Sequence, residues 1–272
     1  IDLAGGDPTM GNLVFGSPLA LAQVYRSCAE MSWGMPGFQE HLDEAIATAQ
    51  PLDPTAYVLA VYVKCVCIVL GIYLADDTTL QQSADALAIA ERSGDPMTVG
   101  FALMARGIIL VHCDGQDYGD GDDLLGQARA MALAHQLAFL TVPLVDIHTA
   151  VRKAHRAEFD HAIELSRAAL DNLIASGDGA FRGLATTTLV DALLCRGTGA
   201  DIAEAQAAID RLAAVPTDQG YVMHELPLLR MRALLARAQG DDDGYRDYRD
   251  RYRKMATDLG FEGHMQWAEA MP

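Results

Sequence analysis

The sequence has few cations and very few lysines. Its 272 residues include 37 Asp and Glu against 20 Lys and Arg, which gives a formal net charge of −17. The lysines are Lys64, Lys153 and Lys254. A protein that wraps a polyanion needs a dense cationic surface. We therefore expect no direct binding to nucleic acid.

Cysteine is scarce as well. The odd number of scattered cysteines predicts buried thiols in a reducing compartment rather than a disulfide framework. No secretory signal sequence is present, so we expect a cytoplasmic protein. The sequence starts at Ile1 rather than Met, so we also expect it to be a piece of a longer chain. The five cysteines are Cys28, Cys65, Cys67, Cys113 and Cys195.

Catalytic motifs are missing too. The sequence contains no G-x-x-x-x-G-K-[ST], G-x-S-x-G, H-E-x-x-H or C-x-x-C, the patterns that bind phosphates, present a nucleophile or hold a metal. We therefore expect no catalytic residue, no metal and no cofactor, and hence not an enzyme. The Gly-rich start predicts a linker or irregular segment over residues 1–16. The Asp-rich stretch 114–123 misses the spacing of a calcium loop and predicts a solvated turn.

One long apolar run, Thr55–Ala75, has about the length of a membrane span. Lys64 stands at its centre, where a charge costs about 3 kcal/mol on insertion scales. Sustained strand-type alternation is absent elsewhere. The run therefore predicts a helix buried among other helices.

Helix signals recur at a nearly constant interval. Ser17-Pro18, Asp53-Pro54 and Asp95-Pro96 each combine an N-cap side chain with proline at the first helical position. Amphipathic second helices are predicted to follow, at intervals of 35 to 44 residues. Such spacing is typical of stacked helix pairs. We predict an all-α superhelical solenoid of about six pairs over residues 17–272, with second helices beginning near Phe38, Leu80, Leu124, Phe159, Ile202 and Tyr245.

Two of the predicted second helices have informative surfaces. Ala157–Leu170 resembles the second helix of a tetratricopeptide repeat, with Ala162 and Ala169 allowing close helix approach. The cation-rich segment after Asp242 has an apolar stripe that includes Tyr245 and Tyr252. Aspartates four residues before its cations predict three ion pairs on a solvent face, namely Asp242 with Arg246, Asp247 with Arg251 and Asp250 with Lys254.

A ladder of polar residues follows the same interval. Its members are separated by 42, 42, 43 and 41 residues within the predicted first helices. If they line a concave face, they favour an anionic ligand or an acidic peptide. The alternative is that each first helix merely exposes one polar edge. The predicted binding residues are Lys64, Arg106, His148, Asp191 and Arg232, with Arg152 beside them.

Several segments resemble a known family. Gly6–Ala22, Asp85–Pro96, Ile202–Asp218 and Ala233–Pro272 are similar to the C-terminal helical-repeat region of actinobacterial, especially mycobacterial, multidomain signalling proteins. Those proteins join a class III adenylate cyclase domain or a LuxR-type DNA-binding domain to a signal-transduction ATPase and then to this region. The cyclase aspartates and the phosphate-binding loop have no counterpart in this sequence, so no catalytic residue carries over.

The resemblance implies a sensing or regulatory scaffold. Its partners would be its own upstream ATPase and cyclase domains, together with a protein, a peptide or an anionic small molecule. One alternative is the same role in a LuxR-type transcription regulator. Another is a stand-alone enzyme with a groove site around His148 and His155.

Overall fold

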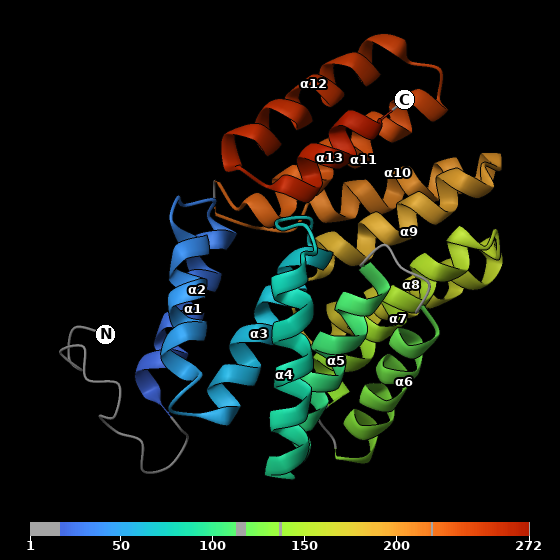
Figure 1. Cartoon of the computed structure of the whole chain (residues 1–272). Helices are drawn as coiled ribbons and strands as arrows, with labels where there is room; N and C mark the ends of the chain where they lie inside the picture. The colour runs from blue at the N-terminus through green and yellow to red at the C-terminus, as the bar shows by residue number, and fades with distance from the viewer. Residues whose placement is uncertain (1–16, 113–117, 136–137, 219, 272) are drawn as a thin grey trace. The chain divides into compact units, whose positions relative to one another are not determined.

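The computed structural model describes residues 17–112, 118–135, 138–218 and 220–271 (Figure 1). Within these ranges the backbone forms thirteen α-helices and no strand, which confirms the all-α prediction. The predicted irregular segment 1–16 lies outside the described residues. The helices are α1 (Pro18–Ser32), α2 (Phe38–Ala49), α3 (Pro54–Val69), α4 (Asp77–Ser93), α5 (Pro96–His112), α6 (Tyr118–Ala134), α7 (Ala138–His155), α8 (Phe159–Ala175), α9 (Arg182–Arg196), α10 (Gly199–Ala213), α11 (Val222–Ala238), α12 (Asp242–Leu259) and α13 (Glu262–Ala270).

The helices divide into two compact units, Ile1–Leu137 with α1–α6 and Ala138–Pro272 with α7–α13. In the first unit α1 packs on α2, α3 on α4 and α5 on α6, and α3 also contacts both α1 and α5. In the second unit α7 packs on α8, α9 on α10 and α11 on α12, and α9 also contacts α7 and α11. In each unit the first helices of successive pairs therefore lie side by side.

The three predicted proline-led helix starts are confirmed. α1 begins at Pro18, where the Ser17 side chain accepts a hydrogen bond from the backbone of Ala20. α3 begins at Pro54 behind Asp53, and α5 begins at Pro96. Each cap oxygen accepts one of the N–H groups that a helix leaves unpaired at its start.

The predicted starts of the second helices are right only at Phe38 and Phe159. α4, α10 and α12 begin three residues before the predicted positions, because Asp76, Thr198 and Asp241 cap them and the first turn is polar. An apolar pattern detects only the buried part of such a helix. The N-terminal turn that precedes that part is defined by its cap.

The largest error concerns α6. The solvated turn predicted for 114–123 is wrong from Tyr118 onward, where the backbone is helical; residues 114–117 lie outside the described part of the chain. Gly121 faces Gly107 of α5, so closely that an added Cβ on Gly121 would lie 3.1 Å from the Gly107 carbonyl oxygen. Glycine weakens an isolated helix, but here it allows α5 and α6 to approach closely.

α3 is buried on nearly every side, as predicted. Tyr57, Val61 and Cys65 are among its fully buried side chains. The helix ends at Val69, so it is shorter than the apolar run. No helix in the described ranges combines the length and the apolar character that crossing a membrane requires.

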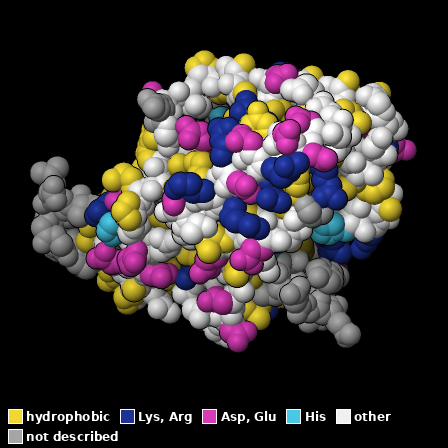
Figure 2. All heavy atoms as spheres, turned by 90° about the horizontal axis from the view of Figure 1, so that it is seen from above, with side chains coloured by type: hydrophobic (Ala, Val, Ile, Leu, Met, Phe, Trp, Pro, Cys, Tyr) yellow, Lys and Arg dark blue, Asp and Glu magenta, His cyan; other side chains and the backbone are white. Residues whose placement is uncertain are grey.

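α12 has the predicted apolar stripe, with Tyr245 and Tyr252 buried. Of its three predicted ion pairs, the one between Asp247 and Arg251 is confirmed, at 3.1 Å. The other two are wrong, because Arg246 pairs with Asp243 and Lys254 pairs with Asp258. Aspartates nonetheless accompany the cations, and Figure 2 shows acidic side chains interspersed among basic ones on the face that it presents.

α9 and α11 touch at a glycine. Pro227 lies inside α11 and has no N–H, so it cannot donate to the carbonyl of Met223 one turn earlier. Gly183 of α9 packs directly on this carbonyl, where an added Cβ would stand 2.5 Å from the oxygen. The close contact fixes the spacing of two helices that form the site described next.

Candidate functional site

A cavity of about 570 Å³ lies in the second unit, along α7, α9 and α11. Each helix contributes residues spaced by three, four or seven positions, which places them on one helical face. All of the lining residues except Thr188 lie at or beyond the midpoint of their helix. The lining residues are Val151, Ala154 and His155 of α7, Thr188, Asp191, Leu194 and Cys195 of α9, and Arg230, Leu234, Arg237 and Ala238 of α11.

Two of the lining residues, Asp191 and Arg230, form an ion pair. Nη1 of Arg230 donates to both carboxylate oxygens of Asp191, at 2.9 and 3.0 Å. The Arg230 side chain is 19% exposed and that of Asp191 37%. Asp191 raises the pKa of Arg230 against the opposing effect of burial, so the guanidinium stays charged. The pair joins α9 to α11 and places a fixed cation in the cavity.

Arg230 uses little of its hydrogen-bonding capacity. Among the described residues, its guanidinium hydrogen-bonds only to Asp191, and only through Nη1. Its Nε is buried without a hydrogen-bond partner in this part of the chain. The ring of Trp267 in α13 lies 5.9 Å from the guanidinium carbon and contributes a cation–π contact. Nη2 is therefore a donor that a bound molecule could use.

Polar residues surround the outer part of the cavity. His155, Cys195 and Arg237 are exposed, and Cys195 is a free thiol. Partial burial, and then the charge of Asp191, raise the pKa of this thiol, so Cys195 is protonated at neutral pH. The Arg237 guanidinium carbon lies 5.6 Å from the centre of the Tyr245 ring. Cys195 thus serves better as a reporter of occupancy than as a nucleophile.

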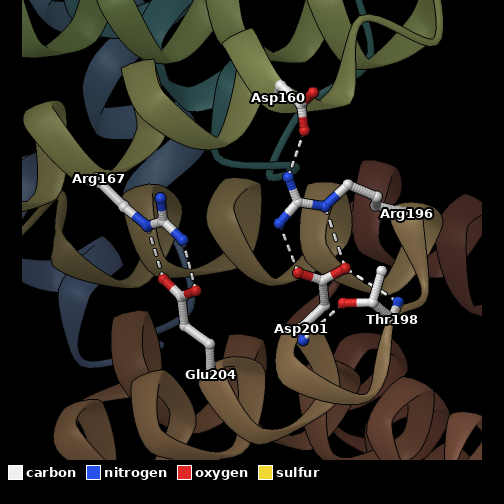
Figure 3. Close-up of polar contacts among 6 residues, drawn as sticks. All are labelled: Asp160, Arg167, Arg196, Thr198, Asp201 and Glu204. Atoms are coloured by element: carbon white, nitrogen blue, oxygen red, sulfur yellow. Dashed lines mark hydrogen bonds and ion pairs between the residues drawn. The ribbon is translucent and has the colours of Figure 1, made fainter.

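A network of ion pairs joins α9 to α8 and α10 (Figure 3). Arg196, at the end of α9, donates Nε and Nη2 to the two oxygens of Asp201 at 3.1 and 2.6 Å, and Nη1 to Asp160 of α8. Arg167 of α8 pairs with both oxygens of Glu204 in α10, at 2.7 and 2.5 Å. The two arginines therefore tie α8, α9 and α10 together.

Asp201 also completes the cap of α10. Its side chain accepts from the Thr198 backbone N–H at 2.9 Å, while the Thr198 hydroxyl accepts from the Asp201 N–H at 3.2 Å. The Asp201 side chain is 1% exposed. Arg196, followed by the Thr198 hydrogen bonds, holds the pKa of this carboxyl well below its usual range. Asp201 therefore stays ionised although it is buried.

Only one of the six predicted ligand residues, Asp191, lines the cavity. His148 is buried in α7 and Arg152 is half-buried one turn further along. The Arg232 guanidinium carbon lies 6.0 Å from the centre of the Tyr248 ring, so this side chain faces α12. His155, which the enzyme hypothesis combined with His148, does line the cavity.

The two predicted residues of the first unit contact second helices of their own unit. Nζ of Lys64 donates to Asp43 of α2 at 2.8 Å. Nη1 of Arg106 donates to the Leu80 carbonyl in α4 at 2.9 Å and lies 3.3 Å from the Ser83 hydroxyl. A single site formed by all six residues stays a prediction.

Lys64→Met is expected to change the free energy of unfolding by less than about 1 kcal/mol, because replacing a buried charge with an apolar side chain of similar length is often neutral. The lysine side chain is 11% exposed, but Asp43 is 59% exposed and can return to water. Urea unfolding followed by circular dichroism measures the change. A loss above about 3 kcal/mol would contradict this account of Lys64.

The repeat interval in the sequence does not identify Arg230, which is the principal cation of the cavity. Arg230 precedes Arg232 by two residues, and this places it on a different side of α11. The available signal was its spacing to Leu234 and Arg237, which share one face of the helix. A constant interval of 41 to 43 residues along the sequence selects Arg232 instead.

Comparison with known proteins adds no assignment. No family model matches the chain, and no curated protein matches it.

Proposed function

We propose that the chain is a non-catalytic binding and regulatory scaffold, built as a tetratricopeptide-like solenoid of about six helix pairs. The successive contacts α1–α3–α5 and α7–α9–α11 within the two units support the repeat arrangement. The observation that carries the function is the cavity of about 570 Å³ formed by three first helices. Its volume falls within the range of about 300–1,000 Å³ that is common for ligand sites.

The family resemblance supports a place for this scaffold at the regulatory end of a larger signalling protein. In this proposal, occupancy of the cavity biases an upstream ATPase and the cyclase joined to it. A ligand can act in this way only if it binds the two states of the larger protein with different affinity. The ion pair between Asp191 and Arg230 links two of the lining helices, so it is positioned to respond to a bound molecule.

The test uses the natural full-length protein and blocks the cavity. Ala238 is the exposed last residue of α11 and lines the cavity, whereas Ala213 is the exposed last residue of α10 and does not. We expect Ala238→Trp to change the rate of ATP hydrolysis at least about fivefold, the lower end of typical allosteric coupling. Ala213→Trp should leave the rate unchanged.

The reading frame upstream of Ile1 decides which activity is measured. A cyclase or ATPase domain calls for nucleotide turnover, and a helix-turn-helix domain calls for operator binding. If Ala238→Trp and Ala213→Trp have the same effect on that activity, the regulatory role of the cavity is wrong.

A further inference from the structure

We infer that the cavity along α7, α9 and α11 binds a small amphipathic anion, a molecule with an apolar body and one anionic head that pairs with Arg230. The inference rests on the proposed function, because it takes this cavity as the ligand site. It goes further by naming the chemistry of the ligand and the residue that selects it.

The apolar part of the lining indicates the body of the ligand. Val151, Ala154, Leu194, Leu234 and Ala238 contribute only aliphatic surface. Burying that surface against an apolar ligand contributes roughly 25 cal/mol per Å². Among the residues that the structure describes, the lining includes no Asn or Gln, the side chains that most readily hydrogen-bond an extended peptide backbone. A compact apolar molecule therefore fits this surface better than a peptide.

The charged part of the lining indicates the head. The described lining carries Arg230 and Arg237 against Asp191, a formal local net charge of +1 in a protein whose formal net charge is −17. Nη2 of Arg230 has no acceptor among the described residues, since the bonds to Asp191 use Nη1 alone. An anionic oxygen in the cavity would accept a charge-assisted hydrogen bond from Nη2.

Asp191 is the internal competitor for this head. It is more exposed than Arg230, 37% against 19%, so it can turn towards water when an anion approaches the guanidinium. Removing its charge should therefore strengthen binding of an anion, and removing Arg230 should weaken it. Binding that depended only on apolar surface would not respond in opposite directions to these two substitutions. Opposite changes in affinity would therefore indicate that the anion pairs with Arg230.

The test uses two fluorescent probes with the full 272-residue chain. One is 8-anilinonaphthalene-1-sulfonate, and the other is N-phenyl-1-naphthylamine, which has the same rings without the sulfonate. We expect one sulfonate probe to bind per chain. Arg230→Met should weaken this binding at least about tenfold, as for the loss of a charge-assisted hydrogen bond, and Asp191→Asn should strengthen it about threefold or more.

The neutral probe should respond to neither substitution by more than about twofold. Arg211→Met is the control, because it removes the same charge from α10 of the same unit, at an exposed residue that does not line the cavity. It should change sulfonate binding by less than about twofold. Circular dichroism and thermal unfolding confirm that each variant is folded, since loosely packed states also bind such dyes.

Cys195 locates the bound probe. Its exposed thiol lines the cavity, so the bound sulfonate probe should slow its alkylation by iodoacetamide, measured by peptide mapping.

Slowed alkylation of Cys195, together with the predicted changes in sulfonate binding for Arg230→Met and Asp191→Asn, supports the inference. Suppose that both probes protect Cys195 equally and that Arg230→Met changes the affinity of neither probe. The cavity then binds apolar ligands, and the inference that it selects an anionic head group is wrong. If neither probe protects Cys195, the inference fails, while the proposed regulatory role is still decided by Ala238→Trp.

Discussion

Gly183→Ala is expected to lower the free energy of unfolding by about 2 kcal/mol. The new methyl group would lie 2.5 Å from the Met223 carbonyl oxygen, which belongs to the α11 backbone and cannot turn aside. Overpacking of this kind costs about 1–3 kcal/mol. Alanine gains up to about 1 kcal/mol over glycine within a helix, but less in the first turn, where Gly183 lies. The clash with the Met223 carbonyl therefore outweighs the helix propensity of alanine, and Gly183→Ala should destabilise the protein.

Gly199→Ala is the matched control for that substitution. Gly199 also lies in the first turn of a helix of the second unit, and a Cβ there meets nothing within 4 Å. We expect a change of about 0.5 kcal/mol or less, towards greater stability. Urea unfolding of both variants, followed by circular dichroism, provides the comparison. Equal stability of Gly183→Ala and Gly199→Ala would show that α9 and α11 can separate without cost.

Asp201→Ala should lower the free energy of unfolding by about 2–3 kcal/mol at neutral pH. The substitution removes half of the capping box of α10, and a cap contributes about 1 kcal/mol. It also removes the buried acceptor of two donors of Arg196, and hydrogen bonds to charged groups contribute about 1.5–3 kcal/mol. Partial exposure of Arg196 limits the total, because the freed guanidinium regains water.

The effect of Asp201→Ala should depend on pH. Because Arg196 lowers the pKa of Asp201 in the folded protein, the folded state favours the ionised carboxylate. The resulting stabilisation is present above the unfolded pKa, about 4, and is lost as the pH falls below it. The difference in stability between the wild type and Asp201→Ala should therefore be constant from pH 7 to about pH 5 and narrow below about pH 4.

Asp160→Ala is the control for Asp201→Ala. Asp160 contacts the same Arg196, but its side chain is 91% exposed. Exposed ion pairs contribute about 0–1 kcal/mol, so we expect a change of 0.5 kcal/mol or less. Urea unfolding at several pH values tests both variants. An Asp160→Ala loss as large as that of Asp201→Ala would contradict the assignment of the stability to the buried carboxylate.

The sequence predicted the features of the fold that depend on local chemistry. Capped prolines such as Pro18 and Pro54 mark helix starts because neighbouring atoms satisfy the first N–H groups. Contacts between helices were not predictable in the same way. Gly121 weakens an isolated helix, and only its packing on Gly107 explains why α6 includes it. α13 was missed because its nine residues are too few for a clear apolar period.

The candidate site was predicted only in part. A constant interval along the chain finds equivalent positions only if every connection has the same length and every helix the same rotation. Asp191 meets Arg230, which lies 39 residues later, whereas the expected interval of 41 residues selects Arg232. A shift of two residues rotates a side chain by more than half a turn of the helix. Arg230, and not Arg232, therefore lines the cavity.

Lys64 has a further consequence before folding is complete. From Pro54 to Val69 it is the only charged residue, so the unfolded chain would otherwise present an uninterrupted apolar segment rich in valine. Such segments associate with one another while a protein is being synthesised, and a single charge within them opposes that association. The ion pair with Asp43 then accommodates the same charge in the folded unit. We therefore expect the amine at position 64 to protect the nascent chain from association more than it stabilises the finished fold.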